Sequence, residues 1–404
     1  MTIAIITLDN PPVNALSFAY SAQLLAQVQS AENDASVEAV VFTGANEIFS
    51  AGADINDFVN EPAADSKTVR DVIAAIENGG KVYVAAIAGN CMGGGLELAL
   101  ACDYRVASAT SKLGLPEIKL GLLPGAGGTQ RLPRLIGAQD ALQMMLKGET
   151  VLAEDAKTKG LIDAVASGDV LETAKTYAGK AKRRVSEMNL SLRGLPANAV
   201  PFVIAQAHKM CPAEDNGGFA AHKVVDAVQA AFELPFHRGL AREARLFEEL
   251  VRSQPSLALR HIFFAERELS KIPGLPSNGQ GGAAQIAKAG VVGGGTMGTG
   301  IAIAFANAGI PVTVIEPSSE QIEKARRMVF GMFMHQVKRG RLTQEEAWKR
   351  GQSIVFTGDY NDVAAADVVV EAVFENMDVK KEVFRTLDAI VKPEGILASN
   401  TSTL

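Results

Sequence analysis

Two glutamates in the first half of the sequence, Glu97 and Glu117, each adjoin a segment rich in glycine. Glu97 follows Gly93-Gly94-Gly95 and lies in the first turn of a helix predicted over Leu96–Asp103. The glycines let the backbone approach a ligand closely, and the free N–H groups of a helix start can hold negative charge that develops in a reaction. Taken singly, Glu97 is also explained as a carboxylate favoured by the helix dipole, and Glu117 as a surface loop residue.

A second glycine cluster, with Gly293, Gly295 and Gly298 in the spacing GxGxxG, follows a predicted strand at Ala287–Val292 and opens a predicted helix. Such glycines allow a tight turn, and the helix N-terminus that follows receives a pyrophosphate. The next predicted strand ends at Glu316, where an acid binds a ribose diol and favours NAD over NADP. The pattern therefore predicts NAD as cofactor; the alternative is a structural glycine turn without a ligand.

The elements that must position these groups fall into three regions. Residues 1–190 alternate helices with predicted strands, among them Ile3–Leu8 and Val82–Ile87. Residues 191–282 are mainly helical and end in a linker rich in Pro, Gly, Ser and Asn. Residues 283–404 begin with the strand, glycine turn and helix of the predicted NAD site. The alternation of strands and helices predicts an α/β fold, with a doubly wound Rossmann-type domain in the last region.

One uncharged stretch, Ala289–Ile315, is long enough to cross a membrane. It contains seven glycines and Pro311, and it divides into strand, glycine turn, helix and strand. Short apolar runs of this kind are typical of strands buried on both faces of a parallel sheet. We therefore reject a membrane span.

Charge and cysteine content exclude several function classes. The chain has 39 basic and 45 acidic residues, whereas a dedicated nucleic-acid binder usually has a basic excess. The three cysteines (Cys91, Cys102 and Cys211) have neither paired nor metal-ligand spacing, so we expect no disulfide framework and no metal site.

Several segments of the first region resemble the crotonase (enoyl-CoA hydratase/isomerase) family in order and spacing. They are Ser50-Ala51-Gly52-Ala53-Asp54, Gly93-Gly94-Gly95-x-Glu97, Pro116-Glu117 and Gly121-x-x-Pro124-x-x-Gly127-Gly128-Thr129-Gln130-Arg131-Leu132. The resemblance covers roughly the first 190 residues and implies a crotonase-like ββα spiral core.

The resemblance implies that the substrate is a 2-enoyl thioester of coenzyme A. The backbone N–H groups of Ala53 and Gly94 would stabilise the enolate oxygen that forms when water adds at C3. Glu97 and Glu117 would hold the water, one acting as base while the other supplies a proton to C2. Both acids are present, which favours hydration over isomerisation, for which the family needs only the Glu117-type residue. The resemblance also places two residues near the adenine of CoA, Ala51 and Ile55.

The end of the sequence resembles 3-hydroxyacyl-CoA dehydrogenases over 366–376 and 396–404. This resemblance places Glu375 and Lys380 near the nicotinamide end of NAD, and Ser402 at the 3-hydroxyl of the substrate. Otherwise the first two would be an exposed polar helix start, and the third a loop-capping hydroxyl. The family's catalytic histidine lies beyond the Asn-Thr-Ser motif, whereas all five histidines here precede it. We therefore expect this polypeptide to bind NAD. We expect oxidation of 3-hydroxyacyl-CoA only in a longer, intact chain.

The order of the two regions resembles the multifunctional enzymes of fatty-acid β-oxidation, which join a 2-enoyl-CoA hydratase to a 3-hydroxyacyl-CoA dehydrogenase. The alternatives are an enoyl-CoA isomerase and a non-catalytic CoA- or NAD-binding scaffold. The expected partner is an acyl-CoA thioester, with no nucleic acid. The sequence leaves both a bacterial cytoplasm and a peroxisome open, and it does not decide on acyl chain length, a thiolase partner or a homo-oligomer.

Overall fold

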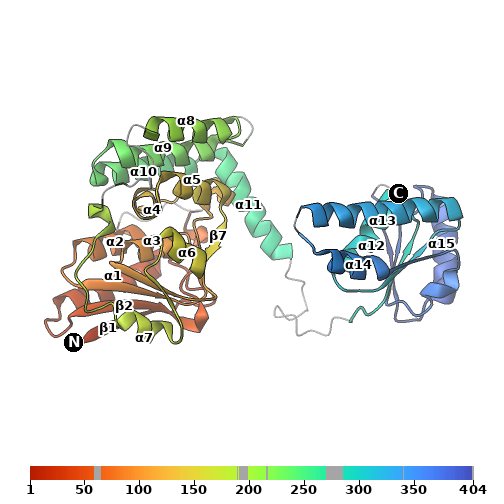
Figure 1. Cartoon of the computed structure of the whole chain (residues 1–404), viewed down its shortest axis with the longest axis horizontal. Helices are drawn as coiled ribbons and strands as arrows, with labels where there is room; N and C mark the ends of the chain where they lie inside the picture. The colour runs from red at the N-terminus through yellow and green to blue at the C-terminus, as the bar shows by residue number, and fades with distance from the viewer. Residues whose placement is uncertain are drawn as a thin grey trace. The chain divides into compact units, whose positions relative to one another are not determined.

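The computed structural model describes residues 1–58, 65–188, 190, 199–214, 217–269, 285–339 and 341–402. The chain forms two compact units, Met1–Lys271 and Ile272–Leu404, which are described separately (Figure 1). The linker expected just before residue 283 lies outside the described residues.

A parallel sheet of five strands organises the first unit, in the order β1-β2-β3-β5-β8. Its strands are β1 (Ile3–Leu8), β2 (Ala39–Gly44), β3 (Val82–Ile87), β5 (Tyr104–Ser108) and β8 (Ala164–Ala166). Val40 and Phe42 join the main core on one face, whereas Ala39 and Val41 pack with α7 (Val170–Lys175) on the other. Both faces are therefore covered, which is why the strands are continuous apolar runs. The strands predicted at 3–8 and 82–87 are confirmed.

A smaller sheet, β4-β6-β7, leads into the buried helix that carries Glu97. Its first strand, β4 (Asn90–Met92), continues through Gly93 into α3 (Gly94–Ala101). Every residue of α3 is buried, so this helix is apolar on all sides except at Glu97.

The other elements of this part of the first unit are β6 (Lys112–Gly114), β7 (Thr150–Leu152), α1 (Phe18–Asn33), α2 (Val69–Asn78), α4 (Gly128–Ile136), α5 (Ala138–Lys147) and α6 (Ala153–Lys159).

Four further helices belong to the first unit. They are α8 (Val200–Met210), α9 (Phe219–Glu233), α10 (Phe236–Val251) and α11 (Gln254–Leu269). Of these, α8, α9 and α10 lie against α4 or α5 (Figure 1). Val224, Val228 and Leu246 lie in the same hydrophobic core as the strands. The helices expected in the second region therefore complete the core of the first unit.

The second unit is built on a parallel sheet in the order β11-β10-β9-β12-β13. The strands are β9 (Ala289–Val292), β10 (Val312–Ile315), β11 (Ile354–Thr357), β12 (Val368–Glu371) and β13 (Ile396–Ser399). The helices are α12 (Thr296–Asn307), α13 (Ser319–Lys338), α14 (Gln344–Gln352) and α15 (Met377–Ile390). One core holds α12, α13 and α14 against the sheet, and another holds α15 against it. In chain order the strands are arranged 3-2-1-4-5, and ligands bind such sheets where the order reverses, here between β9 and β12.

The uncharged stretch at 289–315 forms β9, α12 and β10, as its glycines predicted. Within the described part of the chain, no helix has both the length and the apolar character needed to cross a bilayer.

Candidate active site

A cavity of about 960 Å³ opens in the first unit. One wall consists of the segment around residues 51–58, the start of α3 and the short turn that begins at Glu117. The opposite wall consists of side chains from α10 and α11. Both acids singled out in the sequence line this cavity, Glu97 from α3 and Glu117 from the turn.

Glu97 is held as a hydrogen-bond acceptor at the start of α4. Its side chain is buried, and its Oε1 accepts hydrogen bonds from the N–H groups of Ala126 (2.7 Å) and Gly128 (2.8 Å). Burial raises the pKa of Glu97 above its ordinary value, while these two N–H donors oppose the rise by stabilising the carboxylate.

Glu117 has the opposite environment. Its Oε2 is buried and has no hydrogen-bond partner among the described residues. Burial raises the pKa of Glu117 well above its ordinary range, and the negative charge of Glu97 raises it further. Its Oε1 lies against Gly93, because a Cβ placed on Gly93 would come within 3.0 Å of this oxygen. Burial thus raises the pKa of both acids, but only Glu97 has backbone N–H donors from α4 that stabilise its carboxylate.

Two residues with backbone N–H groups of interest, Ala53 and Gly94, line the same cavity. Gly94 is the first residue of α3, so its N–H has no acceptor within the helix. A Cβ on Gly94 would lie 3.2 Å from the backbone nitrogen of Ala53, which shows how closely the two segments approach. Neither N–H has an acceptor among the described residues. The arrangement can receive an oxygen that gains negative charge beside both carboxylates.

The rest of the cavity is partly cationic and partly apolar. Ala51 and Ile55, expected near adenine, both line it. So do Arg70, the exposed Lys119 and Arg260, whose guanidinium donates to the carbonyl oxygens of Phe58 and Val251 (2.6 Å each). The apolar lining includes Phe247, Leu257, Leu259, Ile262 and Phe263.

A third acid at this site, Glu243 of α10, has no recognisable sequence signal. It is 1% exposed, and its Oε1 accepts a hydrogen bond from the N–H of Gly127 (2.6 Å). Its Oε2 accepts from the N–H of Thr129 (3.0 Å) and from the Thr129 hydroxyl. Burial, together with the charge of Glu97, raises the pKa of Glu243 to about 8. Gly127 and Thr129 lie more than 100 residues before Glu243 in the sequence, and the Arg/Glu pattern around Glu243 is typical of a solvated helix. The sequence therefore offers no reason to single out Glu243.

The glycine turn of the second unit has the shape of a dinucleotide site. Gly293 has φ +107°, a conformation that favours glycine, and a Cβ on Gly298 would collide with the carbonyl oxygen of Gly293. Nothing lies within 4 Å of a Cβ placed on Gly295, the N-cap of α12. The first turn of α12 therefore presents its N–H groups to open space, which fits a pyrophosphate.

Glu316 follows β10 and turns back toward this loop, since its Oε2 accepts a hydrogen bond from the N–H of Gly294 (3.0 Å). Its carboxylate is therefore beside the glycine turn, where the ribose diol of NAD would bind.

The other predicted residues of the second unit cluster at the carboxyl ends of β12 and β13. Lys380 is buried and donates to both carboxylate oxygens of Glu371 (2.8 and 3.1 Å), while Glu375 lies farther away, at 3.9 Å. Glu375 instead accepts a hydrogen bond from the Thr401 hydroxyl (2.6 Å), and Ser402 is exposed. The sequence reasoning missed Glu371, which is fully buried and holds Lys380 in place.

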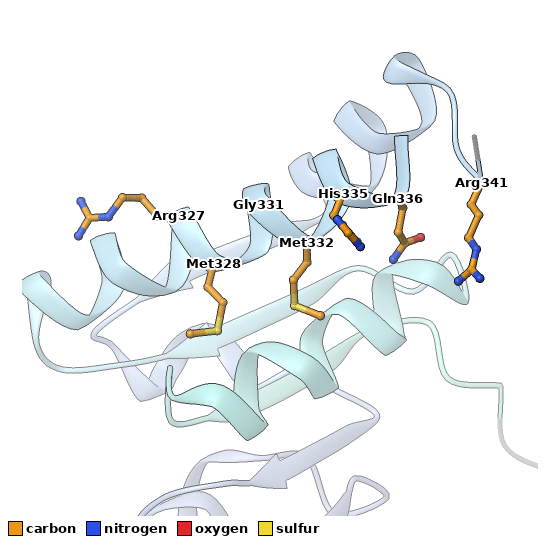
Figure 2. A pocket seen from close by; sticks show the side chains of 7 residues that line it. All are labelled: Arg327, Met328, Gly331, Met332, His335, Gln336 and Arg341. Carbon is orange, nitrogen blue, oxygen red and sulfur yellow. The ribbon is translucent and has the colours of Figure 1, made fainter. Parts of the chain in front are cut away.

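A separate groove of about 490 Å³ runs along α13, where Figure 2 shows Met328, Met332 and His335 on the helix. It shares no lining residue with the glycine turn or with the ends of β12 and β13. His335 is thus placed in this groove and not among the residues predicted to contact NAD. Among the described residues, no cluster of His, Cys, Asp and Glu could hold a metal ion.

Comparison with known proteins bears on both units. Residues 1–188 match the enoyl-CoA hydratase/isomerase family, and residues 288–404 match the NAD-binding domain of 3-hydroxyacyl-CoA dehydrogenase. The two matches follow one another along the chain in the order hydratase/isomerase, then NAD-binding domain. This confirms the predicted fold class, a crotonase-like core followed by a Rossmann-type domain, and NAD as the cofactor of the second domain.

Several curated proteins match this chain over its whole length. The peroxisomal bifunctional enzymes of Homo sapiens and Danio rerio are 39% and 40% identical to it, and each is covered over 56% of its own length. A peroxisomal fatty acid β-oxidation multifunctional protein of Arabidopsis thaliana is 36% identical and covered over 57%. The chain thus spans little more than half the length of these relatives.

Proposed function

We propose that the first unit hydrates 2-enoyl-CoA thioesters to 3-hydroxyacyl-CoA in fatty-acid β-oxidation. One observation carries this proposal: Ala53 and Gly94, whose N–H groups have no acceptor among the described residues, line the same cavity as Glu97 and Glu117. Hydration needs both features, because negative charge develops on the thioester oxygen while one proton leaves water and another reaches carbon.

In the proposed reaction the thioester oxygen accepts hydrogen bonds from the N–H groups of Ala53 and Gly94. Water forms a C–O bond at C3, the C2–C3 double bond becomes an enolate, and the enolate takes a proton at C2. Donors fixed before the reaction stabilise the enolate oxygen more strongly than the neutral carbonyl, so they lower the barrier.

The environments of the two acids support a division of roles. Glu97 receives two N–H hydrogen bonds, which stabilise its carboxylate, so we assign it as the base that accepts a proton from water. Glu117 has a raised pKa and an unpartnered Oε2, so we assign it as the acid that delivers a proton to C2. Proton exchange between the two acids through a second water returns both to their starting states.

Binding of CoA is proposed for the same cavity, with Ala51 and Ile55 beside the adenine. Lys119 and Arg70 supply positive charge for phosphates, and the aromatic and aliphatic lining from α10 and α11 suits an acyl chain.

The NAD-binding domain would serve the next step, since hydration produces the secondary alcohol that a dehydrogenase oxidises. We propose that Gly293, Gly295 and Gly298 cradle the pyrophosphate and that Glu316 binds the ribose diol. Glu375 and Lys380 would lie near the nicotinamide, and Ser402 at the substrate hydroxyl. Oxidation of 3-hydroxyacyl-CoA is proposed as the reaction that this NAD-binding domain serves, and a peroxisomal location is supported by the names of the relatives.

Enoyl-CoA isomerisation is a second candidate activity, favoured by the free Oε2 of Glu117. When Glu117 is ionised, its carboxylate can take a proton from C2 and return it at C4 without the help of Glu97. A 3-enoyl-CoA substrate tests this activity separately.

The loss of enoyl-thioester absorbance after adding crotonyl-CoA to the chain tests the hydratase proposal. We expect catalytic turnover that continues after one equivalent of substrate has been consumed. A non-catalytic CoA-binding scaffold would bind crotonyl-CoA without this loss, and that result would overturn the proposal.

A further inference from the structure

Four successive backbone N–H groups at the start of α4 are shared between two acids in alternation. The N–H groups of residues 126 and 128 donate to Glu97, whereas those of residues 127 and 129 donate to Glu243. Peptide groups that are adjacent in the chain cannot be reoriented independently. The direction of the N–H groups that donate to Glu97 therefore depends on the direction of those that donate to Glu243.

Glu243 reaches this segment because one face of α10 lies against the start of α4. Residues 239, 243 and 247 are four apart, so their side chains follow one another along that face. A Cβ on Gly239 would collide with the Gln130 side chain, and the Phe247 ring lies against Gly125. The absence of a side chain at residue 239 thus allows the helices to approach until Glu243 contacts the N–H groups.

All contacts of the Glu243 carboxylate are with donors: two backbone N–H groups and the Thr129 hydroxyl, which itself accepts from the Gln130 amide. The charged groups around it come from several elements. They are Arg70 and Glu77 from α2, Glu97 from α3, Glu117 from the turn before α4, and Arg131 from α4. Above its pKa of about 8, the negative charge of Glu243 also acts on both proposed catalytic acids, in addition to its contacts with the α4 segment.

We propose that Glu243 is a positioning residue for hydration: it holds the start of α4 so that the N–H groups of residues 126 and 128 fix the Glu97 carboxylate. The proposal rests on the hydratase function proposed above. It also places a required group of the site in α10, outside the residues that match the hydratase/isomerase family.

The test compares Glu243→Gln with Glu249→Gln, a variant on the same helix whose carboxylate pairs with Lys223 at 2.9 Å and is 48% exposed. We expect Glu243→Gln to lower kcat on crotonyl-CoA about 10- to 100-fold, with KM changed by less than about threefold. The alkaline limb of its kcat/KM profile should move to lower pH, because above about pH 8 the wild-type Glu243 is ionised, and Glu117 ionises more easily once that neighbouring negative charge is gone. Glu249→Gln should keep the wild-type rate and profile.

A second variant, Thr129→Val, keeps the Glu243 carboxylate but removes the hydroxyl that donates a hydrogen bond to it. This variant tests the positioning role of Glu243 even if Glu243→Gln does not fold. We expect a shift of the alkaline limb in the same direction but smaller, because loss of this donor makes Glu243 less ionised. A uniform loss of rate without a shift of the limb, or an unaltered profile in both variants, would overturn the positioning role. A wild-type chain that is inactive on crotonyl-CoA would overturn the hydratase function as well, so the two failures are distinguishable.

Discussion

Replacement of Glu117 by glutamine should separate catalysis from stability. Glutamine keeps the size of the side chain but cannot donate a proton to C2. Loss of a positioned general acid or base lowers rates about 10²- to 10⁴-fold, which corresponds to about 3–5 kcal/mol of activation free energy. We therefore expect Glu117→Gln to lose at least about 100-fold in kcat on crotonyl-CoA.

The same change should stabilise the fold above mildly acidic pH. The pKa of Glu117 is raised in the folded protein by burial and by the charge of Glu97, so the native state binds its proton more tightly than the unfolded state does. The stability due to this proton is present below the unfolded pKa and is lost as the pH rises toward the folded pKa. Between these two values the wild type loses about 1.36 kcal/mol per pH unit for this proton, and the glutamine variant does not.

The assay combines absorbance kinetics with denaturant unfolding from pH 4 to pH 8. We expect Glu117→Gln to match the wild type in unfolding free energy near pH 4 and to exceed it near pH 8. Glu149→Gln, which changes an exposed carboxylate (68%) loosely paired with Lys147, should retain both the activity and the pH slope of the wild type. A near wild-type rate in Glu117→Gln would refute the catalytic assignment, and an unchanged pH slope would refute the raised pKa.

Three further predictions concern residues in the two domains. Gly128→Ala should lower hydration at least about tenfold, because its Cβ would lie 2.8 Å from Glu97 Oε1 and displace the carboxylate, as initial rates on crotonyl-CoA would show. Gly298→Ala should weaken NAD binding at least about tenfold by calorimetry, because its Cβ meets the turn carbonyl, whereas Gly300→Ala, with open space around it, should bind as the wild type does. Lys380→Met should destabilise the NAD-binding domain by about 3–5 kcal/mol in denaturant unfolding at pH 7, because it leaves Glu371 buried without its cation. This deficit should shrink as the pH falls and Glu371 takes up a proton.

Much of the fold could be predicted because its signals are local. The strands at 3–8 and 82–87 are short apolar runs between polar turns, and the structure gives them the same bounds. The glycine turn at 293–298 is equally local, since strand, turn and helix follow one another directly in the sequence. Glu97 and Glu117 stand close together in the sequence and line one cavity in the structure.

What could not be predicted depends on contacts between distant segments. Glu243 contacts Gly127 and Thr129 across more than 100 residues, and nothing in the Arg/Glu pattern of α10 distinguishes it from the solvated acids beside it. Glu371 belongs to an apolar strand, and its role becomes visible only when Lys380 folds back from α15. Both acids are recognisable from burial and pairing, which are properties of the packed structure.

The unpartnered oxygen of Glu117 also argues against a scaffold without turnover. A buried polar atom that lacks a hydrogen bond destabilises a protein by about 1–3 kcal/mol, and a raised pKa adds a further loss of stability at neutral pH. A CoA-binding scaffold would be more stable with glutamine or an apolar residue at this position. The arrangement is explained if the missing partner is supplied by the substrate and its water, because the free energy lost in the empty site is then recovered where the proton must be transferred.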